Sequence, residues 1–550
     1  MADSNDRSIS MPAASTGNPI ISANEPNSLS DPLVPPDVDD AAAGALTKKL
    51  AASRDVWYLW CFMGYIGFGI FVELYTNLFV DVIDKGNYTE ASFYSSVAIT
   101  LYSVASFFVS PVAATASDSI GRRPIFLLAT ISDTVAMFVS GAFPNNWVFI
   151  ICVILFGGGD NSYATGMGLL ADYVGSTPMY HAGSKDDSHT FQCLFWVARF
   201  GADTSKMELD QAAYFEYEMN IHFVMTLLIQ SVGTVVGILA ATILYYATLS
   251  YQISYLCGTL FFLPMVPYVY WYMPETVPSE RLQPLTCAAC CDALKSQLES
   301  VTLFADNRRL WGIAFVGFLI QFVSTGIFDV FLYWGEWKFG WLTPEEAVAL
   351  VLSFCPAALG AIGAPWLAVR AFGGTLNYAA LIASFALLAS VASVFAGLAT
   401  SDLGVFIALF FFGVGFGNSP AIYSQISAEA GPEKQGRVQG FNYAVYTVAW
   451  ASAPLIYQAM FAAYIDDDSI FNDEDDGDDD CTDDHGGDDG CGDDDVMTHV
   501  HNLPSSLIWW VSAVVLFIAA AFMFFVVGNS TASKLASGSS AAAPAPGAAP

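Results

Sequence analysis

Twelve long apolar segments, separated by shorter polar ones, run along most of the chain. Each is close to the roughly 20 residues that a helix needs to cross about 30 Å of hydrocarbon. Apolar runs of this length predict membrane-spanning helices rather than strands. We therefore expect an all-α membrane protein whose twelve spans lie at residues 56–80, 91–114, 124–142, 147–170, 223–247, 252–273, 311–333, 346–369, 375–398, 402–425, 438–463 and 504–528.

The spacing of the segments predicts two halves, because six spans precede and six follow a polar stretch. The ends of the chain are polar or rich in Pro and small residues, which is typical of disordered tails. The expected parts are a tail (1–54), an N-terminal six-helix bundle (55–273), a linker (274–310), a C-terminal six-helix bundle (311–530) and a second tail (531–550).

Two loops are unusually long. The insert 175–222 contains an apolar stretch that would lie on the membrane surface, pack on the bundle or dock a partner. The loop 466–495 carries 17 of the 52 acidic residues, and its runs of Asp and Gly repel one another. We expect this loop to be solvated and disordered; loose capture of cations such as calcium is the alternative.

Composition excludes several classes of protein. Hydrophobic residues make up 55% of the chain, far above the level of soluble domains, so lipid is the expected surrounding. No basic face exists to neutralise phosphates, so nucleic-acid binding is not expected.

The basic residues predict the orientation, because they are retained on the cytoplasmic side. With both termini inside, 17 of the 19 Lys and Arg fall on that side and only Lys85 and Lys338 fall outside. Asn87 begins a glycosylation sequon in the first outer loop, which agrees with this orientation. The plasma membrane and an endomembrane both remain open.

A charged run between the second and third spans carries a recognisable pattern. Residues 114–124 read ATASDSIGRRP. This run resembles the loop signature of the major facilitator superfamily, in which Asp118, Gly121, Arg122 and Arg123 match the family pattern. The resemblance covers all twelve spans. It implies two six-helix bundles with a solute site between them near the middle of the bilayer.

The resemblance also implies a role for this loop as a cytoplasmic gate. In the family its acid pairs with basic residues and with the N-terminal end of a helix from the second half, where the helix dipole favours negative charge. We assign this role to Asp118, Gly121, Arg122 and Arg123, although Ser119 stands where the family usually has a base. The end of the sixth span, residues 273–276, is similar to the family as well.

Parts of the sequence resemble two different branches of the superfamily. Asp172, residues 332–341 and residues 431–440 are similar to the tetracycline-resistance and hippocampus-abundant-transcript branch. Asp160 with its preceding glycine, and residues 118–123, are similar to the proton-coupled folate transporter group. The fourth span lacks the Arg and the fifth lacks the Gly-Pro signature of proton-driven drug antiporters, which counts against antiport and leaves symport and uniport open.

Ionisable residues within a bilayer are costly and usually functional. The expected spans hold four, all acidic: Glu73, Asp133, Asp160 and Asp329. No Arg, Lys or His lies deep in any expected span. The resemblance implies that spans one, four, seven and ten line the central cavity, and three of the acids fall on them. We interpret Asp133 as a structural carboxylate. Asp329 lies near the outer end of its span, where we expect water to reach it.

Glu73 is the strongest candidate for a functional acid. Together with Tyr65, Gly69 and Asn77 it recurs every four residues, so these side chains share one helix face. A carboxyl group shielded from water can take up and release a proton during transport. The alternative is a structural carboxylate bonded to a neighbouring helix.

Further polar groups complete the candidate site. Asp160 and Asn161 form a polar patch in the fourth span, and Asn418 and Tyr423 offer hydrogen bonds in the tenth. The candidates for binding solute or protons are Glu73, Asn77, Asp160, Asn161, Asp329, Asn418 and Tyr423.

These features favour secondary transport of a small organic solute by alternating access, with proton coupling as a hypothesis. An acid-only interior favours protons or cationic solutes over anions, which counts against folate. A non-transporting receptor or scaffold of the same fold is the alternative. The membrane part of the sequence holds no nucleotide loop, no Ser-His-acid set and no His pair at metal spacing, so we expect no enzyme, cofactor or metal, and a monomer in the bilayer.

Overall fold

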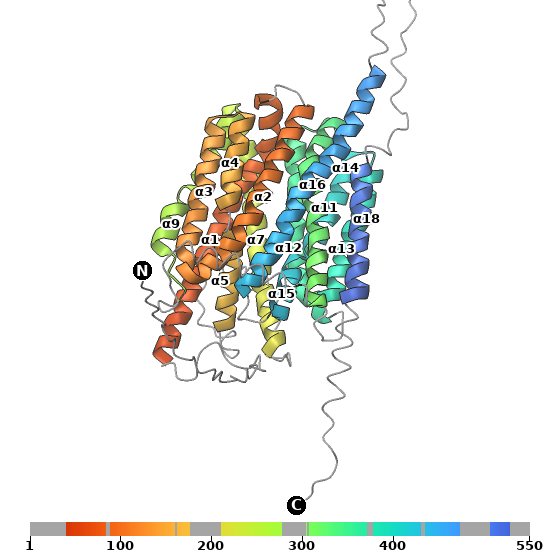
Figure 1. The fold of residues 1–550 in the computed structure, drawn as a ribbon. Coiled ribbons are helices and arrows are strands. Elements are labelled where there is room, and N and C mark those ends of the chain that lie inside the picture. Colours follow the sequence, from red (N-terminus) through yellow and green to blue (C-terminus); the bar gives the residue numbers. More distant parts are fainter. Residues whose placement is uncertain are drawn as a thin grey trace, which may run out of the picture.

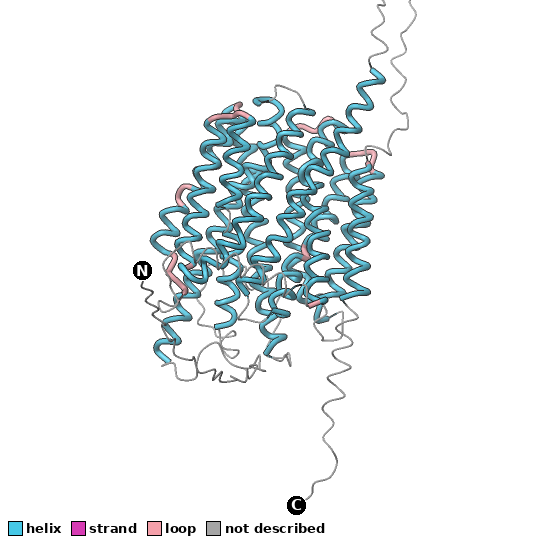
Figure 2. The backbone as a smooth tube through the Cα atoms, in the orientation of Figure 1, coloured by secondary structure: helices cyan, strands magenta, loops and turns pink. Residues whose placement is uncertain are grey.

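The computed structural model describes residues 40–83, 88–159, 162–176, 211–277, 304, 307–370, 378–430, 435–472 and 506–527. Helices account for almost all of these residues, and no strand occurs among them. The helices form one elongated bundle in which most run nearly side by side (Figures 1 and 2).

The first half contains eight described α-helices. They are α1 (Asp40–Asn77), α2 (Tyr88–Ile120), α3 (Arg122–Ala142), α4 (Asn146–Gly159), α5 (Ser162–Ser176), α7 (Gln211–Thr248), α8 (Tyr251–Phe262) and α9 (Met265–Tyr272), with a π-helical stretch η1 (Leu78–Ile83) directly after α1.

The second half contains seven described α-helices. They are α11 (Arg308–Phe339), α12 (Thr343–Arg370), α13 (Tyr378–Leu398), α14 (Asp402–Phe416), α15 (Ser419–Ala430), α16 (Gln435–Asn472) and α18 (Leu507–Phe522), with a π-helical stretch η4 (Met523–Val527) directly after α18.

The predicted all-helical membrane fold is confirmed. Within the described ranges, ten helical stretches are long and apolar enough to cross a membrane. They correspond to ten of the twelve expected spans. The fourth expected span corresponds to α4 and α5, of which 146–157 is a shorter apolar helix, and the eleventh corresponds to α16.

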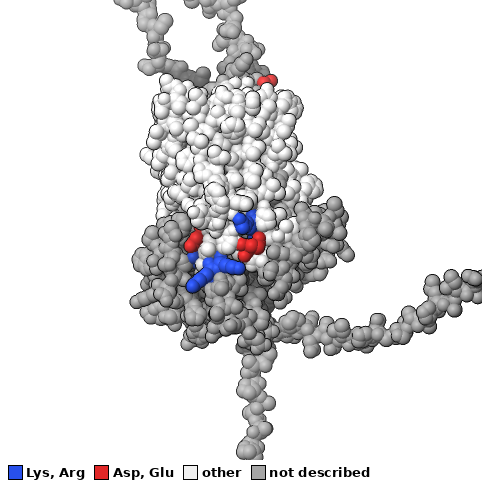
Figure 3. All heavy atoms as spheres, turned by 90° about the vertical axis from the view of Figure 1, so that its left-hand side faces the viewer, with Lys and Arg blue, Asp and Glu red and all other residues white. Residues whose placement is uncertain are grey.

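The surface of the bundle suits a lipid solvent. Figure 3 shows charged side chains gathered near the lower end of one face, below a broad band that is almost free of charge. Large apolar side chains point outward around the bundle, among them Leu128, Phe138 and Ile243, which are 58%, 56% and 68% exposed. In water such a surface would be unfavourable, whereas lipid tails solvate it.

Helices from the two halves pack along two seams. In the first seam α2 packs against α16, and in the second α7 packs against α12. The helices α1, α3 and α7 begin at the bottom of Figure 1, which we call the predicted cytoplasmic end. The helices α2 and α12 begin at the opposite end, which we call the predicted outer end.

Glycines permit the closest helix contacts. At Gly69 on α1, a Cβ atom would overlap the backbone carbonyl of Thr234 on α7 and crowd Gly237. Small residues at such crossings let two helix backbones approach closely. In lipid the hydrophobic effect does not drive helices together, so close packing of this kind contributes to their association. This contact brings the next turn of α1, which carries Glu73, directly onto α7.

Candidate functional site

Two carboxylates meet at the predicted outer end, one from each half of the chain. Glu73 on α1 and Glu346 on α12 are 0% and 1% exposed and interact electrostatically. Asn77, one turn after Glu73, donates from Nδ2 to Oε2 of Glu346 over 3.1 Å. On the other side, the hydroxyl of Thr242 on α7 donates to Oε1 of Glu73 over 3.4 Å. We call these four residues the outer acid cluster.

The sequence identified half of this cluster. The four-residue spacing placed Glu73 and Asn77 on one face of α1, and the structure brings both to the cluster. At Gly69 and Glu73 this face packs against α7. Glu346 was missed because it lies 269 positions from Asn77 and at the very edge of an expected span.

A further buried carboxylate, that of Asp329, lies near the outer acid cluster at the junction of α2 and α11. Asp329 is only 8% exposed, although its place near the end of a span predicts contact with water. Ser96 on α2 donates to Oδ2 of Asp329 over 2.7 Å, and Tyr333, one turn further along α11, donates to the hydroxyl oxygen of Ser95 over 3.4 Å. The hydroxyl of Tyr75 on α1 donates to the backbone oxygen of Ser95 over 3.1 Å. Two helices, α1 and α11, therefore converge on one turn of α2.

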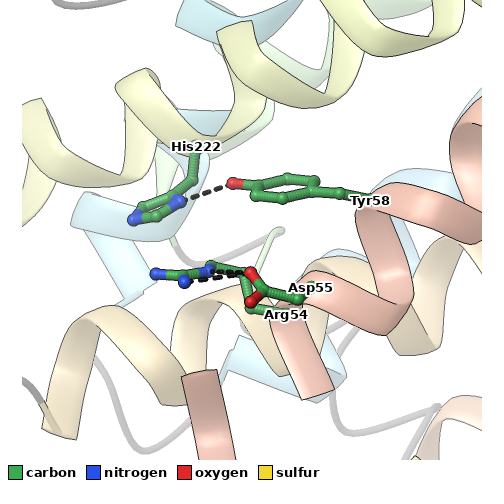
Figure 4. Close-up of polar contacts among 4 residues, drawn as sticks. All are labelled: Arg54, Asp55, Tyr58 and His222. Atoms are coloured by element: carbon green, nitrogen blue, oxygen red, sulfur yellow. Dashed lines mark hydrogen bonds and ion pairs between the residues drawn. The ribbon is translucent and has the colours of Figure 1, made fainter. Parts of the chain in front are cut away.

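A polar cluster in the half of the bundle toward the predicted cytoplasmic end corrects the expectation of an acid-only interior (Figure 4). The side chain of Arg54 is 2% exposed and binds Asp55 through Nε and Nη2 at 3.1 and 3.0 Å. Its guanidinium lies 4.5 Å from the ring centre of Tyr173 on α5. Beside it, the hydroxyl of Tyr58 lies 2.6 Å from Nδ1 of His222 on α7, and both side chains are buried.

Arg54 and His222 were missed because they lie just outside the apolar segments at 56–80 and 223–247. The helices begin well before those segments, α1 at Asp40 and α7 at Gln211, so both side chains lie within long helices and are covered by neighbours. The candidate spans accordingly include them. A buried Arg is tolerated because an acid and an aromatic face accompany it.

The predicted cytoplasmic gate has an additional member. Gly121, with φ +118°, precedes the first turn of α3. The backbone N–H groups of Arg122 and Arg123 donate to the two carboxylate oxygens of Glu275, at 3.0 and 3.3 Å. Glu275 follows α9, so this described contact stays within the first half. The side chain of Asp118 lies outside the described part of the chain, and its proposed partner in the second half is untested.

Of the tenth-span candidates, Asn418 lies at the break between α14 and α15, and Tyr423 lies within α15. Asn418 is fully buried, and neither Oδ1 nor Nδ2 has a hydrogen-bond partner among the described residues. The ring of Tyr423 contacts Phe223 of the first half and Tyr446 of the second, with centroids 5.7 and 5.6 Å apart. Tyr423 is therefore part of an aromatic contact between the halves.

Several sequence-predicted positions lie outside the described residues. These are Asp160, Asn161, the sequon residue Asn87 and most of the two long loops.

This arrangement defines the class of protein: an integral, multi-pass membrane protein with buried polar clusters where its two halves meet. The family model of the Major Facilitator Superfamily matches residues 223–454. No curated protein matches the chain by sequence. Among solved structures, that of the human organic anion transporter MFSD10 (TETRAN) is similar, with a TM-score of 0.57 and 15% identity over 86% of this chain and 99% of that chain.

The two comparisons support the superfamily and the fold. The structural match spans nearly the whole of the human transporter, so the fold is the major facilitator fold. Neither comparison distinguishes the tetracycline-resistance branch from the folate transporter group. The family match over residues 223–454 is in keeping with membrane transport in general, and the structural match extends to the fold alone.

Proposed function

We propose that the protein is a proton-coupled secondary transporter that moves a small organic solute by alternating access. The observation that carries the proposal is the outer acid cluster, in which buried carboxylates from the two halves meet and are joined by the bond between Asn77 and Glu346. Alternating access requires the halves to separate at one end while they close at the other. A titratable contact between the halves links that movement to protons.

The coupling follows from electrostatics. When Glu73 and Glu346 are both ionised they repel one another, and burial strengthens that repulsion. A proton bound by the pair therefore stabilises the closed outer end, whereas loss of the proton favours separation of α1 from α12. Thr242 and Asn77 hold the two carboxylates in this arrangement. In this proposal the end where α1 begins faces the cytoplasm.

The described acids favour a cationic or neutral solute. Glu73, Glu346 and Asp329 all lie buried in the outer half, whereas Arg54 already binds Asp55. The human protein is an organic anion transporter, but at 15% identity its likeness to this chain extends to the fold alone. We therefore propose an organic cation or a neutral solute as the cargo.

The test is proton flux in liposomes that contain the purified protein. Organic cations, neutral drugs, sugars and folates are added in turn, and internal pH is followed with a trapped dye. Wild type is compared with Glu73→Gln and Glu346→Gln. Glu345→Gln is the matched control, because Glu345 neighbours Glu346 in the same turn of α12 but is partly exposed.

The expected result is that one solute class moves protons in wild type and in Glu345→Gln but not in Glu73→Gln. That variant should still exchange labelled for unlabelled solute, since exchange needs no net proton movement. Solute-driven proton flux that is unchanged in both Glu73→Gln and Glu346→Gln would exclude the cluster as the coupling site. If no solute moves in a correctly oriented sample, the receptor or scaffold alternative replaces transport.

A further inference from the structure

A pocket of about 410 Å³ lies in the seam between α2 and α16 at the predicted outer end. Its walls come from the first turns of α2 and the later turns of α16, which run side by side in Figure 1. One turn further into the bundle, the hydroxyl of Thr100 donates to the backbone oxygen of Ala451 over 3.0 Å. That bond joins the two helices below the pocket. The pocket is thus bounded toward the middle of the bundle and lies away from Glu73, whose contacts are with α7 and α12.

One pocket-lining side chain points to a ligand. Gln458 on α16 is 5% exposed, and both Oε1 and Nε2 lack a hydrogen-bond partner among the described residues. Buried amides are nearly always paired, since leaving one unpaired costs about 1–3 kcal/mol. The amide offers a ligand both a donor and an acceptor at the wall of the pocket.

The other lining residues indicate the charge and shape of that ligand. Glu90 contributes the one charged side chain among the residues that line the pocket, and it is acidic. Phe93 and Tyr94 contribute aromatic rings, and Leu455 and Ala459 contribute apolar surface. Aromatic faces beside a carboxylate attract organic cations through the ring quadrupole as well as through charge.

The sequence around the pocket strengthens the preference for cations. Ala462 lines the pocket, and the next turn of α16 begins the run Asp466, Asp467 and Asp468. A concentration of negative charge near a pocket raises the local concentration of cations and speeds their capture.

We propose that this pocket binds an organic ammonium ion with an apolar body, which enters from the lipid side of the seam between α2 and α16. The carboxylate of Glu90 attracts the ammonium group, and the carboxamide oxygen of Gln458 accepts a hydrogen bond from it. The apolar body lies against Phe93 and Leu455. Binding here needs neither a proton gradient nor the outer acid cluster, so it stands apart from the proposed transport activity.

The experiment is photo-crosslinking of the full-length protein in lipid nanodiscs. The probe is dodecylammonium with a diazirine at the end of its chain, and dodecanol with the same diazirine is the neutral counterpart. Labelled peptides are identified by mass spectrometry, and affinity is obtained by competition with unlabelled dodecylammonium. The variants are Glu90→Gln, Gln458→Leu and Ala459→Phe. Val448→Phe is the matched control, because it is an exposed position on α16 about two turns before Leu455, the first lining residue on that helix.

The ammonium probe is expected to label the peptides that carry Phe93 and Leu455 in wild type and in Val448→Phe. Glu90→Gln and Gln458→Leu should each lower its affinity about tenfold, and Ala459→Phe should abolish labelling by filling the pocket. Gln458→Leu should leave the protein at least as stable as wild type, since it removes an unpaired buried amide. The proposal would be overturned if the neutral probe labelled the protein equally, or if the affinity for the ammonium probe were unchanged in all three pocket variants. Either result would mean that the pocket is an ordinary contact with lipid.

Discussion

The amide of Asn77 on α1 donates to a carboxylate oxygen of Glu346 on α12, 3.1 Å away, and both side chains are at least nine-tenths buried. This bond joins the two halves of the bundle at the predicted outer end. Glu73 lies beside this bond. Any movement that separates the two halves at this end therefore changes the surroundings of both the Glu73 and the Glu346 carboxylates.

Asn77→Ala removes the amide donor from a buried carboxylate. We expect it to lower the free energy of unfolding by about 1–3 kcal/mol, because a buried charged group loses a hydrogen bond. Thermal unfolding of the purified protein in detergent measures the change. The double variant Asn77→Ala with Glu346→Leu should recover much of the loss, since it removes both partners. A double variant that shows the full sum of the two single losses would mean that the residues do not act as a pair.

Gly121 occupies a position that other residues cannot adopt without strain. Its φ of +118° lies outside the range that residues with a side chain favour, and a Cβ atom would overlap the carboxylate of Glu275. Gly121→Ala should therefore destabilise the protein by about 1–3 kcal/mol, as measured by thermal unfolding. Gly363→Ala is the control, because a Cβ there meets nothing within 4 Å on α12 and should be neutral or mildly stabilising. Equal effects of the two substitutions would contradict the steric argument.

Glu275 caps α3 from outside the helix. Its carboxylate accepts backbone N–H bonds from Arg122 and Arg123 and also from Thr276 and Val277. Glu275→Ala should reduce stability by about 1–2 kcal/mol, as loss of a helix cap does. Glu275→Gln should lose less, since its carbonyl oxygen still accepts hydrogen bonds while the favourable charge at the helix end disappears. Unfolding curves for the two variants show which of them is less stable. A Gln variant that is less stable than the Ala variant would refute the role of Glu275 as a cap.

The sequence predicted the helices well because membrane spans depend on long apolar runs, a signal that each segment carries by itself. It predicted the polar contacts less well, since those depend on residues far apart. The four-residue spacing on α1 identified Glu73 and Asn77, but nothing local connects Asn77 to Glu346 on the other half. Likewise, Glu275 meets the start of α3 from more than 150 positions away.

Arg54 and His222 illustrate a second limit. Each precedes an apolar segment by one or two residues, so a search for apolar runs places them at a boundary with water. Their burial arises because neighbouring helices extend past the apolar run and cover them, as Tyr173 on α5 covers Arg54. Only the packing of the helices reveals that the half toward the predicted cytoplasmic end contains the buried cation Arg54.

The pairing of Arg54 with Asp55 leads to a double-mutant cycle. Asp55→Asn alone should be destabilising, by about 1–3 kcal/mol, because the buried guanidinium of Arg54 loses a charged acceptor that is itself 31% exposed. Adding Arg54→Gln should restore part of that stability. Chemical unfolding of the four proteins yields the coupling free energy between the two residues. If the effects of the two single substitutions on stability are additive, the contact between Arg54 and Asp55 contributes no coupling free energy.

Asp329 and Ser96 test whether a buried carboxylate anchors α2 to α11. Ser96→Ala removes the hydroxyl that donates to Oδ2 of Asp329 over 2.7 Å, and the other oxygen, Oδ1, has no partner among the described residues. The expected loss of stability is about 1–3 kcal/mol, which is typical when a buried charged acceptor loses its donor. Asp329→Asn should cost less, because the amide oxygen still accepts from Ser96 and no charge remains buried. Thermal unfolding of Ser96→Ala, Asp329→Asn and the double variant separates these contributions. If Ser96→Ala is as damaging in the Asp329→Asn background as in wild type, the charge of Asp329 has no part in the anchor.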